Sequence, residues 1–210
     1  MRGRLITFEG GEGCGKSTHV KLTAEWLRSK GKQVVTAFEP GDTPLGSEIR
    51  KLLLSGEHTP VPEAELFLFL ADRAQHVHKV IQPALADGCW VLCDRYTDST
   101  LAYQMAGRGI SQDEIQDVLR VAEVGNRPEL TLWLDIDLDQ GLQRMRDRND
   151  GRTRLDDESR MFHMRVLQAF AMIFASEPER VCRIDASGEI QTVQNKIRQA
   201  LSHHVPGLDA

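Results

Sequence analysis

The 210-residue chain lacks the features that mark several classes of protein. No stretch approaches the roughly 18 consecutive apolar residues that span a bilayer, and the first apolar run ends at Phe8, too early for a secretory signal. The formal net charge is −5, so the chain has no overall basic field to attract nucleic acid. It also has no internal repeat and no low-complexity tract. We therefore expect a cytoplasmic protein that binds neither membrane nor nucleic acid.

Cysteine and histidine patterns of the kind that bind metals are also missing. The four cysteines are Cys14, Cys89, Cys93 and Cys182, and they form no C-x-x-C pair. A zinc site is not expected without such spacing. A chain of this length buries a core without disulfides, and free thiols fit a reducing compartment. The seven histidines are scattered, and we expect them to be exposed or hydrogen-bonded rather than catalytic.

The most informative motif lies between Gly10 and Ser17. It reads G-G-E-G-C-G-K-S and fits the phosphate-binding loop G-x-x-x-x-G-K-[ST]. A strand-like run at 5–8 precedes it and a helix-like segment follows to about residue 29, which disfavours a chance glycine-rich turn. Glycines let successive N–H groups face an anion, and the helix adds its positive dipole end.

This loop predicts a site for a nucleoside triphosphate. Lys16 is expected to reach the β- and γ-phosphates, and the Ser17 hydroxyl to hold Mg²⁺. The expected contacts come from Gly10, Gly11, Glu12, Gly13, Cys14, Gly15, Lys16, Ser17 and Thr18.

Strand and helix patterns alternate along the rest of the chain. Strands are expected at 5–8, 33–38, 89–94, 130–135 and 181–185. Helices are expected at 17–29, 45–54, 63–86 and 137–147, with a helix that Gly107 to Gly109 interrupts and a helix that Ser111 and Glu114 begin as a capping box. Two more helices are expected near the C-terminus. The alternation predicts one α/β domain over 1–210, with three layers and a mostly parallel five-stranded sheet.

Asp94 ends the third expected strand, at the edge where open parallel sheets bind their ligands. An enzyme with this phosphate-binding loop needs an acidic group opposite Ser17 to position Mg²⁺. The alternative is that Asp94 caps the next helix.

An arginine-rich segment lies further along the chain. It surrounds an Asn-Asp-Gly sequence at 149–151 and contains six arginines: Arg144, Arg146, Arg148, Arg152, Arg154 and Arg160. We predict a lid at about 147–157, because mobile guanidinium groups can close over ATP and neutralise its charge. The alternative is a solvated helix face.

Phe69 and Arg73 lie four residues apart, so one face of a helix carries both. An aromatic ring beside a guanidinium group can stack on a nucleobase and donate hydrogen bonds to it. A pair at this spacing is more often a core phenylalanine and a surface arginine, and spacing alone leaves both interpretations open.

Short motifs elsewhere share an order and spacing that resemble the thymidylate kinase family. They are Phe8–Ser17, Glu39-Pro40-Gly41 with Thr43-Pro44, Glu48–Lys51, Phe69–Gln75, Asp94-Arg95-Tyr96, Ser99-Thr100 with Ala102–Gln104, Gly107–Gly109, Arg127–Thr131 and Arg154–Asp156. The resemblance covers nearly the whole chain. Position 38 holds Phe where the family usually has Arg, and position 42 holds Asp where it usually has Gly.

The resemblance implies transfer of the γ-phosphoryl of ATP to dTMP, with Mg²⁺, by a homodimer joined through helices around 45–105. Its implied catalytic residues are Lys16, Arg95 and the lid residue Arg154, and its implied metal-binding residues are Ser17 and Asp94. The implied dTMP site has Phe69 stacked on thymine, Arg73 bonded to the base and Tyr103 against the C2′ position. The other implied members of this site are Glu39, Arg50, Arg95, Ser99, Thr100 and Gln104.

Three rival functions stay open from the residues alone: a kinase for another small acceptor, a GTP-dependent switch and an ATP-binding regulator without activity. A switch needs a guanine-reading N-K-x-D motif, and the nearest string, Asn195 to Arg198, lacks the Asp. A regulator would need an appended partner-binding segment, and none is evident. The sequence therefore favours a kinase.

Overall fold

Five parallel strands form the centre of the computed structural model, which describes residues 2–147, 153–205 and 208. The strands are β1 (Arg4–Glu9), β2 (Val34–Phe38), β3 (Trp90–Asp94), β4 (Leu130–Asp135) and β5 (Val181–Asp185). Their order is β2-β3-β1-β4-β5, and each neighbouring pair is parallel. The predicted strands and the parallel sheet are confirmed.

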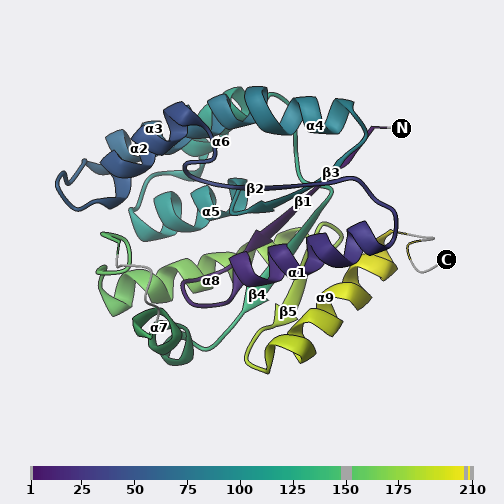
Figure 1. The fold of residues 1–210 in the computed structure, drawn as a ribbon. Coiled ribbons are helices and arrows are strands. Elements are labelled where there is room, and N and C mark those ends of the chain that lie inside the picture. The colour runs from purple at the N-terminus through teal and green to yellow at the C-terminus, as the bar shows by residue number, and fades with distance from the viewer. Residues whose placement is uncertain (1, 148–152, 206–207, 209–210) are drawn as a thin grey trace.

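Alternation along β1 sends its side chains to two different hydrophobic cores. Ile6 and Phe8 pack against α1 (Lys16–Ser29) and α9 (Ile190–His204) on one face of the sheet. Leu5 packs on the other face, against the segments that precede β3. Because successive residues of a strand point to opposite faces, a strand of a sheet covered on both sides is mostly apolar rather than alternating. The predicted three-layer arrangement is confirmed (Figure 1).

The predicted helix at 63–86 exists, with a change of winding inside it. It runs as α3 (Pro62–His76), the π-helical segment η1 (Val77–Ile81) and α4 (Gln82–Ala86). Pro83 cannot donate a backbone hydrogen bond, and its ring would clash with the carbonyl four residues earlier. A wider turn before it relieves that conflict.

The other helices begin and end close to their predicted positions. Thr43 caps α2 (Pro44–Leu54) by accepting a 2.9 Å bond from the Gly46 amide. Ser111 begins α6 (Gln112–Glu123) with the predicted capping box. The remaining helical elements are α5 (Thr97–Thr100), the π-helical η2 (Leu101–Gly107), α7 (Leu138–Arg146) and α8 (Arg160–Ser176).

The carboxyl ends of the three strands β1, β2 and β3 meet at one edge of the sheet. The register pairs Asp94 with Phe8 on one side and with Phe38 on the other. The phosphate-binding loop, the 39–43 loop and Arg95 therefore leave the sheet side by side. The candidate site lies at this edge of the sheet.

Two predictions are not tested by the fold. Residues 148–152 of the predicted lid lie outside the described residues, and the single domain over 1–210 stays a prediction. Within the described part of the chain, no helix combines the length and the hydropathy needed to cross a bilayer.

Candidate active site

A cavity of about 730 Å³ opens at this edge of the sheet. Its walls contain most of the predicted site residues, namely Glu12, Gly13, Gly15, Lys16, Ser17, Thr18, Glu39, Arg50, Phe69, Arg73, Asp94, Arg95, Ser99, Thr100, Tyr103 and Gln104. Four predicted residues lie outside its lining: Gly10, Gly11, Cys14 and Arg154. The cavity thus brings the phosphate-binding loop together with Phe69 and Arg73. In the sequence, Phe69 follows Lys16 by 53 residues.

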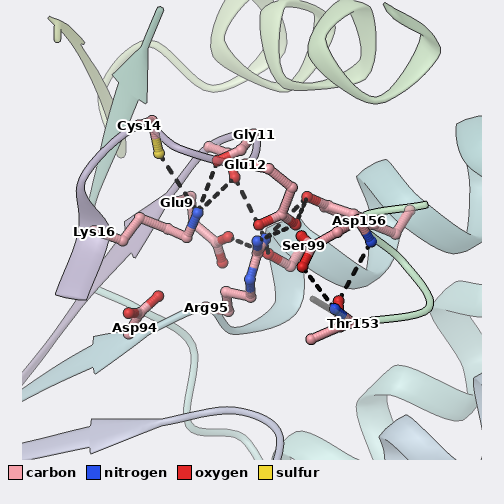
Figure 2. Close-up of polar contacts among 12 residues, drawn as sticks. Glu9, Gly11, Glu12, Cys14, Lys16, Asp94, Arg95, Ser99, Thr153 and Asp156 are labelled. Carbon is pink, nitrogen blue, oxygen red and sulfur yellow. Dashed lines mark hydrogen bonds and ion pairs between the residues drawn. The ribbon is translucent and has the colours of Figure 1, made fainter. Parts of the chain in front are cut away.

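Lys16 lies inside the phosphate-binding loop and is largely buried. Its Nζ donates to the carbonyl oxygens of Gly10 at 3.1 Å and Gly11 at 2.9 Å, and lies 3.4 Å from Cys14 Sγ (Figure 2). These acceptors carry no net charge. A phosphate oxygen can therefore replace them as the partner of the ammonium group.

Gly13 belongs to this loop and adopts a φ of 70°, which favours glycine. A Cβ on Gly13 would lie 2.1 Å from the carbonyl oxygen of Gly141 in α7. A Cβ on Gly141 would in turn lie 2.7 Å from the carbonyl oxygen of Glu12. The loop and α7 therefore touch backbone to backbone, and neither glycine leaves room for a side chain.

Ser17 and Asp94 meet although 77 residues separate them. The Ser17 hydroxyl donates to Asp94 Oδ2 over 2.5 Å. Helix α5 has Tyr96 as its N-cap residue, with no side-chain capping bond, so Asp94 does not serve as that cap. A hydroxyl and a carboxylate side by side are the hard oxygen donors that suit Mg²⁺.

Arg95 connects the two halves of the cavity. Its guanidinium group donates to Glu12 Oε1 at 2.6 Å, to the Tyr103 hydroxyl at 3.2 Å and to Ser99 Oγ at 3.3 Å (Figure 2). The Tyr103 hydroxyl donates to Glu12 Oε1 over 2.8 Å. The backbone of Arg95 has a φ of 68°, in the left-handed region that non-glycine residues seldom adopt. Such a conformation needs support from its surroundings.

Glu9 supplies part of that support. Its Oε1 accepts a 2.7 Å bond from the Tyr96 amide, and its Oε2 accepts a 2.5 Å bond from Ser99 Oγ. Burial, followed by the charge of Asp98, raises the pKa of the Glu9 carboxyl to about 7. The sequence analysis missed Glu9, whose available signal was its position as an acidic residue at the end of a buried strand.

Arg73 is fully enclosed, which excludes the surface-arginine interpretation. Its Nε and Nη2 donate to Glu39 Oε2 at 2.8 and 2.7 Å, and its Nη1 donates to Thr100 Oγ1 at 2.7 Å. Phe69 lies on the same helix and lines the cavity, while its neighbours Leu66 and Leu70 pack into a hydrophobic core. The helix therefore turns one face to the core and a different one to the cavity.

Comparison with known proteins decides the family of the chain. The family model described as thymidylate kinase matches residues 8–197. The chain belongs to the thymidylate kinase family. It is 46% identical over 210 residues to the thymidylate kinase of Nostoc punctiforme, covering 99% of this chain and 100% of that protein. It is 45% identical over 202 residues to the thymidylate kinase of Teredinibacter turnerae, covering 96% and 98%.

A solved structure gives the same family. The crystal structure of thymidylate kinase from Ehrlichia chaffeensis superposes with a TM-score of 0.79 at 30% sequence identity, over 96% of this chain and 100% of that one. The predicted family, fold and kinase activity are confirmed by these likenesses.

Two residues depart from the usual thymidylate kinase pattern. Phe38 lines the cavity with 41% of its surface exposed. Asp42 does not need a left-handed backbone, because the non-glycine residues with positive φ in the described chain are Arg95 and Val124. Gly41, with a φ of 120°, takes the sharp turn instead.

The arginines of the arginine-rich segment differ in their relation to the cavity: Arg144 lines it and Arg154 does not. Arg154 forms an ion pair with Glu65 and donates to the Leu53 carbonyl at 3.1 Å. Arg144 lines the cavity and donates to the carbonyls of Ala186 and Ser187 at 3.0 and 3.1 Å. The cavity lining also contains Thr153, Leu155 and Asp156, which lie within the predicted lid but to which the sequence analysis assigned no individual role.

Proposed function

We propose a division of the thymidylate kinase reaction among the residues of this cavity. The chain transfers the γ-phosphoryl group of ATP to dTMP, giving ADP and dTDP, a step of dTTP biosynthesis. The observation that supports the division is that Arg95 lies between the phosphate-binding loop and the Phe69–Arg73 wall, in one cavity. ATP takes the loop side and dTMP takes the other.

The donor half consists of the loop from Gly10 to Thr18. Its backbone N–H groups and the N-terminus of α1 surround the phosphates. Lys16 exchanges the carbonyls of Gly10 and Gly11 for phosphate oxygens. Ser17 and Asp94 would hold Mg²⁺, which when bound would neutralise charge on the phosphates.

The acceptor half surrounds dTMP. Phe69 stacks on thymine, and Arg73, oriented by Glu39, donates to the base. Tyr103 closes the space at C2′, so that a ribose is disfavoured. The remaining contacts of this half come from Arg50 and Arg95 at the phosphate and from Ser99, Thr100 and Gln104 beside the base.

The chemistry needs charge neutralisation more than proton transfer. The attacking oxygen belongs to a phosphate that is already an anion, so no general base is required. Lys16 and Arg95 lie on two sides of the transferring group. We assign Arg154 to it as well, which requires Arg154 to exchange its Glu65 partner for the phosphoryl oxygens.

The acceptor assignment is tested by Arg73→Ala. We expect the KM for dTMP to rise by about tenfold or more, since a bond to the base is lost, while the KM for ATP stays within about twofold. Initial rates of ADP release with dTMP, dUMP, ribothymidine monophosphate, dCMP and dGMP measure this. The methyl group that separates dTMP from dUMP is worth only about 1–3 kcal/mol, so weak dUMP turnover is expected.

The matched control is Arg120→Ala, on the exposed face of α6, where the side chain is 75% exposed. It should leave both KM values unchanged. An unchanged dTMP KM in folded Arg73→Ala would contradict the placement of the base.

We also propose a homodimer and a cytoplasmic location. Four apolar side chains are exposed on helices that pack side by side: Leu45 and Leu52 on α2, Phe67 on α3 and Val121 on α6. Large exposed apolar side chains on neighbouring helices are typical of an interface. The reduced cysteines suit the cytoplasm.

Sedimentation at micromolar concentration should give the mass of two chains. Phe67→Asp, with its side chain 60% exposed in the free chain, should shift that mass to one chain without unfolding it. A folded Phe67→Asp variant that still sediments as a dimer would exclude this face.

A further inference from the structure

A cluster of five charged residues lies beneath the base pocket. It consists of Glu39 and Asp42 from the loop after β2 and of Asp72, Arg73 and His76 from α3. His76 is fully buried. Its Nδ1 donates to Glu39 Oε1 over 2.8 Å, and its Nε2 lies 3.2 Å from Asp42 Oδ2. The imidazole is therefore held between two carboxylates.

Glu39 has one oxygen for each of two cations. Its Oε1 faces His76, and its Oε2 accepts both bonds from Arg73. The bond to His76 fixes the rotation of the carboxylate, and the carboxylate fixes the guanidinium plane of Arg73. Without His76, Oε1 would be a buried acceptor without its partner, and the carboxylate would turn to seek another donor.

Asp42 joins this arrangement to the wall of the cavity. It lines the cavity with 23% of its side chain exposed, whereas His76 has none. Asp72 Oδ1 accepts a 3.1 Å bond from the Gly41 amide, on the same loop. The 39–43 loop is thus tied to α3 at Glu39, Gly41 and Asp42.

Three acidic groups face two cations in this cluster. Burial and the charge of Glu39 raise the pKa of Asp72 to about 6. Burial alone would lower the pKa of His76, but the bonds and charges of Asp42 and Glu39 outweigh it and raise the pKa to about 9. An imidazolium at neutral pH balances the two carboxylates that it touches.

We propose that His76 is a positioning residue for dTMP, which acts through Glu39 to hold the guanidinium group of Arg73 toward the base, with Asp42 as its second anchor. This role rests on the proposed placement of dTMP beside Arg73. None of the five residues of the cluster belongs to the phosphate-binding loop, so we expect His76 to affect the binding of dTMP and not that of ATP.

The first experiment compares His76→Leu with His76→Asn. Leucine removes the Nδ1 bond to Glu39 and the ion-pair contact of Nε2 with Asp42, whereas the asparagine amide can occupy the position of Nδ1 and donate to Glu39. We expect His76→Leu to raise the KM for dTMP by about tenfold or more, because it leaves the buried Oε1 of Glu39 without its donor and frees the carboxylate that orients Arg73. His76→Asn should recover part of that loss. The KM for ATP should stay within about twofold in both variants.

The second experiment is a pH profile of the KM for dTMP. The charged groups facing His76 are Glu39, Asp42, Asp72 and Arg73, and Cys93 on β3 is a further neighbour. Burial raises the pKa of Cys93 well above its usual range, so this thiol stays neutral. The KM should stay level from about pH 7 to 8 and rise toward pH 9, as the imidazolium loses its proton.

Asp42→Asn should move that rise to lower pH, because a neutral amide no longer favours the imidazolium. Wild type and variant are compared with the same substrate at each pH, so titration of dTMP itself cancels. This arm decides the matter if His76→Leu does not fold.

The outcomes separate the two proposals. An equal rise of both KM values in the His76 variants, or no shift of the pH profile in Asp42→Asn, would overturn the positioning role. Arg73→Ala is measured in parallel. An unchanged dTMP KM in Arg73→Ala contradicts the base pocket itself, whereas a raised KM there with unaltered His76 variants contradicts only the role of His76.

Discussion

Lys16→Ala is expected to lower kcat by about a thousandfold or more while the protein stays folded. Enclosed cationic donors that face developing charge on a transferring phosphoryl group contribute effects of this size. Among the described residues, the Lys16 ammonium group bonds uncharged atoms of its own loop and forms no ion pair, so its loss leaves no described carboxylate without a partner. The core face of α1, built from Val20, Ala24 and Leu27, is untouched.

A coupled assay of ADP release with saturating dTMP measures the effect, and thermal unfolding reports the fold. Lys30→Ala, at the exposed C-terminal end of the same helix, is the matched control and should retain full turnover. A folded Lys16→Ala enzyme with near-normal kcat would refute the assignment of the donor half.

Arg95→Gly should have the second-largest effect, a loss of about a hundredfold or more in kcat, together with a higher KM for dTMP. The guanidinium group lies between Glu12 of the phosphate-binding loop and Tyr103 of the acceptor half. Removing one preorganised donor from such a position typically costs two to three orders of magnitude, about 10²–10³.

Glycine is the informative replacement, because Arg95 has a φ of 68°. A left-handed conformation costs a residue with a Cβ about 1–2 kcal/mol, and glycine avoids that cost. Arg95→Gly therefore separates loss of the guanidinium group from backbone strain. Arg95→Lys keeps the charge but lacks the planar fork, so it should recover only part of the rate. Full activity in Arg95→Lys would show that charge alone is needed, and full activity in Arg95→Gly would exclude a catalytic role.

The sequence predicted what depends on short-range pattern. The loop from Gly10 to Ser17 carries its own signal, because the glycines, the lysine and the serine must be neighbours to surround a phosphate. The strands were recognisable because a sheet covered on both faces needs continuous apolar runs. Asp94 was predicted from its place at a strand end, and it meets Ser17 as expected.

The rest depends on contacts between distant segments. Arg73 is oriented by Glu39, which lies 34 residues earlier, and His76 by the same residue, 37 residues away. No local pattern marks such pairs, so His76 was grouped with scattered histidines of no special role. The Phe69–Arg73 pair was ambiguous for the same reason, since spacing cannot tell which face of α3 meets the core.

Gly141 shows how the close packing of the phosphate-binding loop limits the residue that α7 can carry at one position. Its place inside α7 is unfavourable for a helix by about 1 kcal/mol relative to alanine, and no nucleotide-binding motif includes it. Yet its backbone packs directly against that of Glu12 and Gly13. Gly13 precedes Gly141 by 128 residues in the sequence. In a library of random variants, position 141 should accept as few substitutions as the glycines of the phosphate-binding loop do. A genetic screen would count it among the nucleotide-binding positions although it lies outside the lining of the cavity.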